Sequence, residues 1–403
     1  MKNKLSLLTL CALAFTRLGF AEDRPGVGLL KELVEIESGT SQIDEVNHVQ
    51  DILADHLKKL GFEVLLKANP LGDSKSGKFL VATLVGENSR YINFVLHADT
   101  VFEPKAEFKG FEISPDGKTA KGPGVIDDKG GAVVVLGGIE RYLKARPKPA
   151  HSLRVISSPS EETGTVGFLE DLQKMADDTF VTLGFEPALD EHTIIESRRG
   201  NRWYHIKVTG KEAHAGRAHK EGINACWDLA QKLDLLSRLT DYGKDVTVSI
   251  GRMEGGKDKF NIVCGSAEAK VDARFSDLRS RDVLDKKIVA ILKKPLVKSA
   301  ADRKATTTEF EIADDCPPFS VSKASKPLLE RYCQIAGEIE KSTIKSAKSG
   351  GGADSSYFAR EGGIVIDGLG AVGGKMHTND EFVVLSSLET RAAALAKFLE
   401  ATP

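Results

Sequence analysis

The sequence predicts an α/β fold that carries an inserted α+β domain. A chain of 403 residues is long for one hydrophobic core, so we expect two domains. Towards both ends of the chain, short apolar runs alternate with helical patterns, as in a sheet flanked by helices. Between residues 200 and 304 apolar and polar residues instead alternate one by one, which favours an antiparallel sheet with helices on one face.

The first segment, residues 22–199, combines helical periodicity with short buried strands. Apolar residues recur at three- and four-residue steps over residues 28–59, which predicts two helices, and residues 129–143 have the pattern of another. Short apolar runs bounded by polar residues are typical of strands buried on both faces. The strands predicted here are 62–66, 79–85, 92–96, 153–156 and 181–185.

The predicted inserted domain, residues 200–304, has its own strands and helices. We expect strands at 203–208, 246–250 and 267–275 and amphipathic helices at 222–239 and 281–292. The last segment, residues 305–403, returns to helix and buried-strand patterns. We therefore expect the first and last segments to form one domain that is interrupted by the small one.

Composition describes a globular protein of ordinary type. Charged residues make up 28% of the chain and hydrophobic residues 41%, and the formal net charge is -2. A protein that binds nucleic acid would be expected to carry a basic face, so this balance excludes nucleic acid as the predicted partner. The sequence has no internal repeat and no low-complexity stretch.

Residues 1–21 resemble an export signal. Lys2 and Lys4 give a positive start, residues 5–15 are mostly apolar, and the end of the segment, at Ala21, has the small-x-small pattern of a cleavage site. Arg17 interrupts this pattern, and the alternative is an uncleaved amphipathic helix. We expect a periplasmic or secreted protein with no membrane insertion after cleavage, because no later apolar run is long enough to span a bilayer.

The cysteines do not have the spacing of a metal site. Cys226, Cys264, Cys316 and Cys333 remain after the predicted cleavage, and none of them forms a CxxC pair. An exported protein could pair its cysteines, but Cys226 and Cys333 lie in helical patterns among apolar neighbours, so we expect buried free thiols.

Acidic and histidine clusters carry the chemistry of this sequence. Most of them follow a predicted strand, and in open α/β sheets sites form at the carboxyl ends of strands. Two histidines and three carboxylates offer enough nitrogen and oxygen ligands for two zinc ions, which leaves one glutamate as a base. The clusters are His97-Ala98-Asp99, the glycine-rich stretch Gly122–Gly131 with Asp127, Ser160-Glu161-Glu162, Phe185-Glu186-Pro187 and Met376-His377-Thr378.

Each cluster also has a purely structural alternative. The histidine of His97-x-Asp99 could simply be exposed at a strand end, although Asp99 could brace its imidazole ring. Asp127 could cap the following helix, a role that is compatible with binding metal. The glycine-rich stretch around it lacks the pattern of a phosphate-binding loop. Glu161 and Glu162 could be a solvated pair, but adjacent carboxylates at the end of a buried strand repel each other unless cations offset them.

Taken in order, these motifs resemble those of the two-domain di-zinc exopeptidase family. This family includes glutamate carboxypeptidase (carboxypeptidase G), aminoacylases, dipeptidases and succinyl-diaminopimelate desuccinylase, and the resemblance covers nearly the whole chain after the signal. The Gly350–Asp354 loop and the Phe185–Pro187 motif resemble the glutamate carboxypeptidase branch most. The resemblance implies a zinc exopeptidase-like mixed sheet flanked by helices, with an inserted lid and dimerisation domain.

The resemblance also implies a role for each residue. It assigns one zinc to His97 and Glu186, the other to Glu162 and His377, and makes Asp127 the bridge. Cobalt or manganese would also suit this mixed set. Asp99 would orient His97, and Glu161 would be the general base. Three residues would bind substrate: His214, Asn261 and Arg274. Of these, His214 would reach the active site of the partner subunit in a homodimer.

The predicted reaction is hydrolysis of a peptide or N-acyl amide bond next to a free carboxylate. The alternative within the family is an aminoacylase, dipeptidase or desuccinylase. A peptide-binding protein without activity is disfavoured by the base at Glu161. Two departures bear on specificity: the family's Asn-Ile-Ile-Pro is here Asn261-Ile262-Val263-Cys264, and acidic Asp314 and Asp315 stand where the glutamate carboxypeptidases have an arginine-rich turn.

Overall fold

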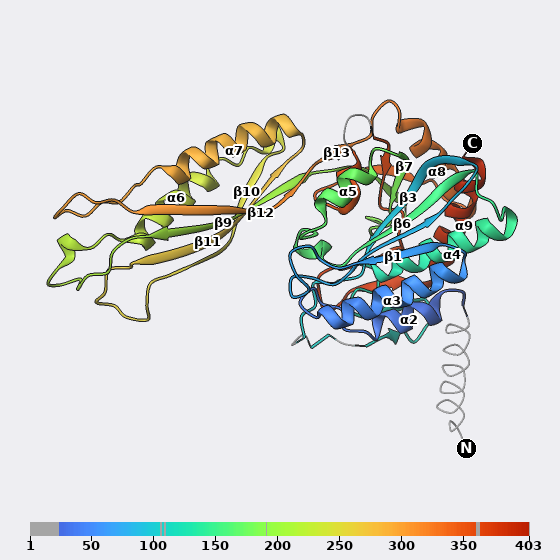
Figure 1. The fold of residues 1–403 in the computed structure, drawn as a ribbon, viewed down its shortest axis with the longest axis horizontal. Helices are drawn as coiled ribbons and strands as arrows, with labels where there is room; N and C mark the ends of the chain where they lie inside the picture. Colours follow the sequence, from blue (N-terminus) through green and yellow to red (C-terminus); the bar gives the residue numbers. More distant parts are fainter. Residues whose placement is uncertain (1–23, 105–106, 109, 191, 360–362, 403) are drawn as a thin grey trace, which may run out of the picture. The chain divides into compact units, whose positions relative to one another are not determined.

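A computed structural model describes residues 24–104, 107–108, 110–190, 192–359 and 363–402 (Figure 1). The chain forms two compact units. Of the described residues, unit 1 contains those up to Ser197, Ser320–Ser349 and those from Ala353 onward, and unit 2 contains Arg198–Phe319 with Gly350–Gly352. The predicted fold class is confirmed, whereas the predicted signal peptide, residues 1–21, lies outside the described residues.

Unit 1 is built on a mixed six-stranded sheet with the order β1-β2-β6-β3-β7-β15. Its strands are β1 (Glu63–Lys67), β2 (Phe79–Leu84), β3 (Asn88–His97), β6 (His151–Ser158), β7 (Thr179–Gly184) and β15 (Val365–Ile366). The strands β6, β3, β7 and β15 run parallel to one another, and β1 and β2 pair antiparallel at one edge. Every residue of β6 is buried, in keeping with its apolar run.

Helices flank this sheet, as the periodicity predicts. They are α2 (Val27–Val34), α3 (Ile43–Lys59), α4 (Lys129–Ala145), α5 (Leu169–Met175), α8 (Lys326–Glu340) and α9 (Leu385–Ala401). Helices α2 and α3 each contact α4, and α4 also packs on α9 (Figure 1). Gly138 permits this close approach, because a Cβ there would lie 2.6 Å from Leu395 Cδ2. None of the described helices has the length and apolar character needed to cross a bilayer.

Shorter elements complete unit 1. One small sheet has the order β16-β17-β5-β4, and another has the order β13-β8-β14. Their strands are β4 (Glu112–Ile113), β5 (Thr119–Lys121), β16 (Gly373–Gly374), β17 (Phe382–Val384), β8 (Thr193–Arg198), β13 (Phe319–Ser320) and β14 (Lys345–Ser349), and the 3-10 turns of unit 1 are η1 (Glu161–Thr163) and η4 (Asp354–Phe358). The pairing of β5 with β17 joins two segments that are more than 250 residues apart in sequence.

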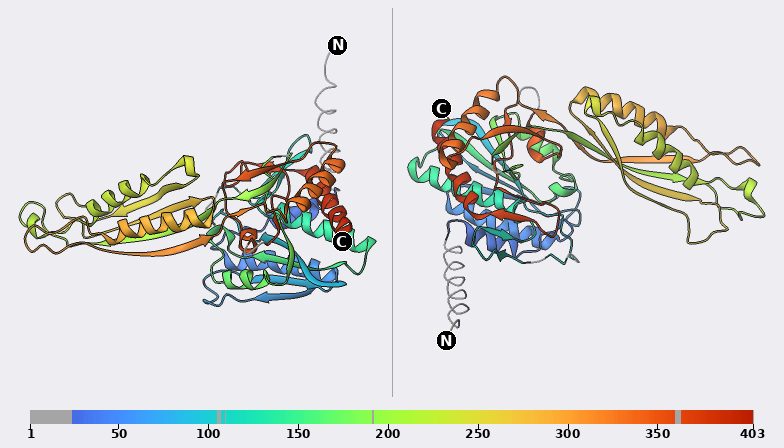
Figure 2. Two further views of the ribbon diagram at one scale, coloured as in Figure 1. Left: turned by 90° about the horizontal axis from the view of Figure 1, so that it is seen from above. Right: turned by 180° about the vertical axis from the view of Figure 1, so that it is seen from behind.

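Unit 2 is an antiparallel sheet with the order β10-β11-β9-β12, covered on one face by two helices (Figure 2). Its elements are β9 (Gly200–Thr209), η2 (His219–Glu221), α6 (Ala225–Ser237), η3 (Tyr242–Lys244), β10 (Thr247–Gly255), β11 (Ser266–Phe275), α7 (Leu278–Lys293) and β12 (Thr307–Cys316). Alternate residues of β9, namely Tyr204, Ile206 and Val208, point into the core beneath the helices.

The end of the inserted domain lies later than predicted. The prediction placed it at residue 304, but β12 pairs along the whole of β9, from Thr307 opposite Thr209 to Cys316 opposite Asn201. This pairing extends unit 2 to Phe319. The prediction missed β12 although residues 309–312 alternate between polar and apolar side chains.

The prediction of free thiols is wrong for Cys226. It forms a disulfide with Cys264, and their Cα atoms are 5.7 Å apart. Cys226 lies in the first turn of α6, and Cys264 lies two residues before β11. The backbone N–H of Ala225 donates to the carbonyl oxygen of Cys264 at 2.8 Å, which holds the two cysteines side by side. Cys333 keeps a free thiol, as predicted.

Candidate metal centre

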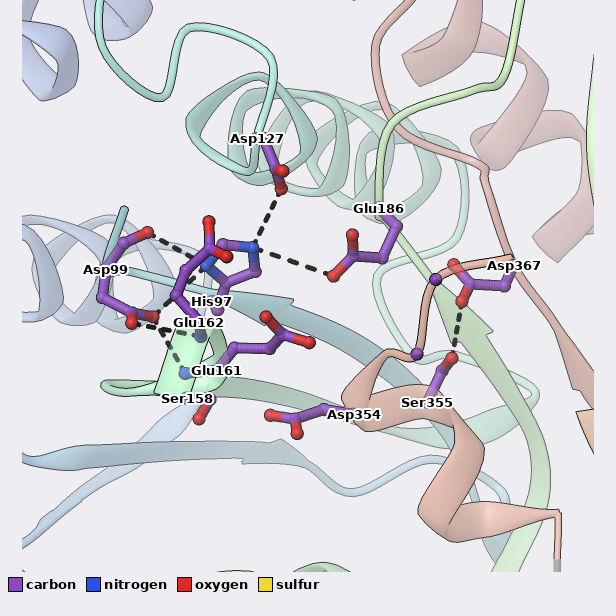
Figure 3. A network of polar contacts seen from close by, with 12 residues as sticks. His97, Asp99, Asp127, Ser158, Glu161, Glu162, Glu186, Asp354, Ser355 and Asp367 are labelled. Carbon is purple, nitrogen blue, oxygen red and sulfur yellow. Dashed lines mark hydrogen bonds and ion pairs between the residues drawn. The ribbon is translucent and has the colours of Figure 1, made fainter. Parts of the chain in front are cut away.

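The carboxyl ends of three parallel strands place the predicted clusters at one edge of the sheet of unit 1. In β3 and β6, His97 is opposite Ser158, and in β3 and β7, Val95 is opposite Gly184. Each of these strands ends at one of these paired residues or within two residues of it. His97, the turn with Glu161 and Glu162, and Glu186 therefore converge (Figure 3).

Two groups of potential ligands share one aspartate. His97, Asp127 and Glu186 form the first group and Asp127, Glu162 and His377 the second, with the ligand atoms of each group within 4.8 Å of one another. Asp127 Oδ1 lies 3.1 Å from His97 Nε2, and Asp127 Oδ2 lies 3.1 Å from His377 Nε2. The two oxygens of one carboxylate thus face opposite groups, as a bridge between two cations requires.

The side chains present fit a pair of zinc ions. His97 Nε2 lies 3.7 Å from Glu186 Oε1, and His377 Nε2 lies 3.4 Å from Glu162 Oε2, so each group offers one imidazole and two carboxylates. Zinc accepts such mixed nitrogen and oxygen ligands. Glu162 Oε1 is buried and has no hydrogen-bond partner among the described residues, a costly state unless a cation lies beside it. The roles of these five residues as metal ligands stay predictions.

Asp99 supports both the histidine and the glutamate turn. His97 Nδ1 lies 3.0 Å from the backbone oxygen of Asp99 and 3.3 Å from its Oδ1. The carboxylate also accepts hydrogen bonds from the backbone N–H groups of Glu161, at 3.0 Å, and Glu162, at 3.3 Å. Because Asp99 engages Nδ1 of His97, the other ring nitrogen, Nε2, is directed at Asp127. The same carboxylate fixes the turn that carries the proposed base.

Glu381 is a residue of this site that the sequence prediction missed. It is buried, and its Oε1 accepts hydrogen bonds from the backbone N–H groups of Ile126, at 3.0 Å, and Asp127, at 3.3 Å. Glu381 lies four residues after His377, so it connects the two loops that carry ligands of the second group. Burial raises the pKa of Glu381 to about 8. The only signal in the sequence is an acidic residue close to a candidate histidine.

Electrostatics distinguishes Glu161 from its neighbours. Burial, and next the negative charge of Glu186, raises the pKa of Glu161 well above its usual range. Hydrogen bonds with Asp127 and Glu162 raise the pKa of His377 to about 10. For Asp127 burial favours the neutral acid, but hydrogen bonds from His377 and His97 outweigh it and keep the pKa below the usual range. The pKa of Glu161 is thus raised, as are those of Glu162 and Glu381, but unlike Glu162 it belongs to neither ligand group.

A second acid, Asp354, lies beside Glu161 (Figure 3). It begins η4, and its Oδ1 accepts a hydrogen bond from Thr165 Oγ1 at 2.5 Å. Burial raises the pKa of Asp354 to about 6. The sequence prediction noted its glycine-rich loop but gave Asp354 no place in the site, because no motif connects it with Glu161.

The three predicted substrate residues all lie in unit 2. The exposed His214 accepts hydrogen bonds at Nδ1 from the backbone N–H groups of Gly216, at 3.1 Å, and Arg217, at 3.2 Å. In the neutral ring the proton must then be on Nε2, which makes this atom a donor. Asn261 is exposed on the neighbouring segment, which forms a β-bridge between Ile262 and His214.

Arg274 is held by two acceptors of unit 2. Its Nε donates to Asp272 Oδ2 at 2.9 Å, and its Nη1 donates to the backbone oxygen of Gly350 at 3.0 Å. Asp272 in turn accepts a hydrogen bond from Trp203 Nε1 at 2.8 Å. Nη2 makes no hydrogen bond among the described residues, so the guanidinium is fixed in place with donors to spare for an anion.

Comparison with known proteins identifies the family. The model of peptidase family M20/M25/M40 matches residues 94–401. The chain belongs to this family. It is therefore an M20 metallopeptidase, a hydrolase that depends on bound metal, and it carries His/Asp/Glu groups suited to that metal.

Individual relatives agree with this assignment. The chain is 27% identical to carboxypeptidase G2 of Pseudomonas sp. (strain RS-16) over 393 residues, which cover 94% of this chain and 89% of that protein. It is 24% identical to succinyl-diaminopimelate desuccinylase of Psychromonas ingrahamii over 383 residues, 91% of this chain and 96% of that one.

Solved structures share the fold. A tripeptidase from Staphylococcus aureus superposes with a TM-score of 0.72 at 20% identity and covers 94% of this chain and 97% of its own. An M20 metallo-carboxypeptidase from Sulfolobus solfataricus gives a TM-score of 0.70 at 15% identity, with 94% and 99% covered. At these identities the likeness establishes the architecture alone.

Proposed function

We propose that this M20 metallopeptidase hydrolyses a peptide or N-acyl amide bond next to a free carboxylate, in the manner of a glutamate carboxypeptidase. The observation that carries the proposal is the pair of ligand groups that share Asp127, with Glu161 beside them. The similarity to carboxypeptidase G2 supports the choice of substrate class. The resident metals would be two zinc ions per chain, with cobalt or manganese as possible substitutes.

The proposed reaction divides its work between the metals and the side chains. Zinc ions held by the two groups would polarise the scissile carbonyl and lower the pKa of the attacking water. Glu161 accepts a proton from that water and returns it to the nitrogen of the leaving amine. His214 donates from Nε2 to the oxygen on which negative charge develops, and Arg274 pairs with the substrate carboxylate.

The structure also bears on the side chain that the substrate carries. Asp315 accepts from Arg202 Nη2 at 2.6 Å and lies 3.5 Å from Arg281 Nη1, and Asp314 bonds to Asn201. These two aspartates of β12 are therefore engaged by residues of unit 2, and they add no cation that could attract a glutamate side chain. The similarity to desuccinylases makes an N-acyl amino acid the second candidate substrate class.

A substrate panel tests the proposal. The purified enzyme, loaded with zinc, would be assayed on C-terminal dipeptides and N-acyl amino acids, each paired with an analogue whose carboxylate is amidated. We expect hydrolysis of the free acids and little of the amides, because Arg274 loses its partner. A chelator should remove the activity and added zinc should restore it. Equal rates on acids and amides would contradict the proposed class.

We further propose that the protein is an exported homodimer in which His214 serves the active site of the partner subunit. The disulfide supports export, because such bonds persist in oxidising compartments. Mixing an inactive His214→Ala protein with an inactive Glu161→Ala protein should then restore part of the activity, since one mixed site has both groups. Subunits that exchange without any rescue would exclude this sharing.

A further inference from the structure

The disulfide of unit 2 lies next to the two segments that carry His214 and Asn261. Ala215 N–H donates to the carbonyl oxygen of Asn261 at 2.9 Å, and Val263 N–H donates to that of Ala213 at 2.9 Å. These bonds make a short antiparallel pairing centred on the bridge between His214 and Ile262. The position of either exposed side chain therefore depends on the other segment.

The Asn261 segment is anchored at its end by Cys264. The disulfide joins Cys264 to Cys226 in the first turn of α6, and the backbone bond from Ala225 lies directly beside it. Helix α6 is itself fixed by its buried face, including Leu229 and Leu233, in the core of unit 2. The covalent bond thus restrains the partly exposed Asn261 segment, because it ties the segment to a helix that is fixed in the core.

We infer that the Cys226–Cys264 disulfide is a positioning device for Asn261 and His214, and that it replaces the proline of the family motif. This inference rests on the proposed function, which places both side chains at the substrate. A proline restricts the backbone through its fixed φ angle, whereas a cysteine at position 264 does not. Here the disulfide to α6 restricts the backbone at position 264 instead.

The activity of this enzyme should therefore depend on the redox state of the pair. Reduction by a phosphine or a dithiol breaks the S–S bond, and each sulfur takes up one electron and one proton to give two thiols, while the reductant loses two electrons. The metal groups lie in unit 1, so the metal content should not change if a reductant that does not bind zinc is used.

Two double variants test the inference without a reductant. In Cys226→Ala/Cys264→Ala the tie is absent, and we expect kcat/KM to fall on the order of tenfold, because small misplacements of substrate-binding groups are costly. In Cys226→Ala/Cys264→Pro the residue of the family motif is restored, and most of the loss should be recovered. Proline at position 264 would remove no backbone hydrogen bond, since the N–H of Cys264 donates none in the described part of the chain.

Hydrogen exchange gives a readout that is independent of activity. The amides of Ala215 and Val263 should exchange faster in the double alanine variant and in the reduced wild type, and more slowly again in the proline variant. Zinc per chain, measured by elemental analysis, should be equal in all of them. Cys333→Ala is the control, because this thiol lies in unit 1 and forms no disulfide.

The outcomes separate the inference from the proposed function. If no substrate of the panel is cut by the wild type, the proposed function fails, and the exchange of Ala215 and Val263 still decides whether the disulfide orders these segments. If substrates are cut but the double alanine variant keeps full kcat/KM and unchanged exchange, the disulfide has no positioning role. Loss of activity that proline fails to recover would also overturn the inference, since it would indicate general destabilisation of unit 2.

Discussion

The two units present their candidate functional residues in opposite ways. In unit 1, His97 and the glutamate turn lie at the ends of aligned strands, and Asp99 and Asp127 are buried. In unit 2 the side chains of His214 and Asn261 are exposed and are oriented by local backbone bonds and by a disulfide. The first arrangement concentrates charge that bound metal would balance, while the second leaves polar side chains open to solvent.

From this difference we expect substitutions in the two units to affect different properties of the enzyme. A substitution among the buried acids of unit 1 should alter metal binding or proton transfer, because these groups interact strongly through a medium of low polarity. A substitution in unit 2 should leave the metal in place and change substrate binding or the stability of that unit. The following predictions test this division.

The largest effect is expected from Glu161→Gln. The amide cannot accept the proton of the attacking water, so kcat should fall by about 10²–10⁴-fold. Zinc per chain, measured by elemental analysis, should not change, because Glu161 belongs to neither ligand group. Glu170→Gln on the exposed surface of α5 is the matched control and should be fully active. A normal kcat in the Glu161→Gln variant would refute the assignment of the base.

His377→Ala should separate the two metals. It removes the imidazole of the second group only, so we expect one zinc per chain instead of two, together with loss of nearly all activity. Zinc content and turnover would be measured on the same preparation. His219→Ala, which changes an exposed histidine of unit 2, should behave as the wild type in both assays. An active variant that retains both metals would show that His377 is not a ligand.

Glu381→Ala should weaken metal binding without touching a ligand. It leaves the backbone N–H groups of Ile126 and Asp127 without their acceptor, so the loop that carries Asp127 becomes less ordered. Loss of such a supporting contact typically costs about 10–100-fold in metal affinity. Titration calorimetry of zinc into the metal-free protein measures it. Glu381→Gln, which keeps an acceptor oxygen, should recover part of the affinity, and Glu400→Ala on the exposed end of α9 should have no effect.

The sequence predicted the fold, and which residues lie together in the two groups of potential ligands, better than the supporting contacts. The strands that end at His97 and before Glu186 were located, because a buried strand appears in the sequence as a short run of apolar residues. Glu381 and the Cys226–Cys264 pair were missed, because their roles depend on partners that only the folded chain brings close. Strand β12 shows a different failure: residues 309–312 alternate, but no strand was predicted there and the inserted domain was ended before it.

The smallest effect on turnover, but a large one on stability, is expected from Asp228→Asn in α6 of unit 2. Asp228 and Lys232 form a buried ion pair, and Asp228 Oδ2 also accepts from Thr306 Oγ1 at 2.6 Å and from the backbone N–H of Leu296 at 2.7 Å. Removing one partner of a buried pair typically costs about 3–5 kcal/mol. Asp234→Asn is the matched control: Asp234 pairs with Arg238 at the same spacing on the same helix but is exposed, so the cost should be below about 1 kcal/mol.

The dependence of this cost on pH gives the sharper test. For Asp228 burial alone would raise the pKa, but the hydrogen bonds from Lys232 and Thr306 outweigh it, and the pKa lies below its ordinary value. A carboxylate with a lowered pKa in the folded state stabilises the protein above its unfolded pKa, about 3.9, and loses this contribution as the pH falls through the lower folded value. The difference in unfolding free energy between wild type and Asp228→Asn, from denaturant titrations, should therefore be constant from pH 7 to about 5 and shrink below about 4. A difference that stays constant down to about pH 3 would mean that the charge of Asp228 does not stabilise unit 2.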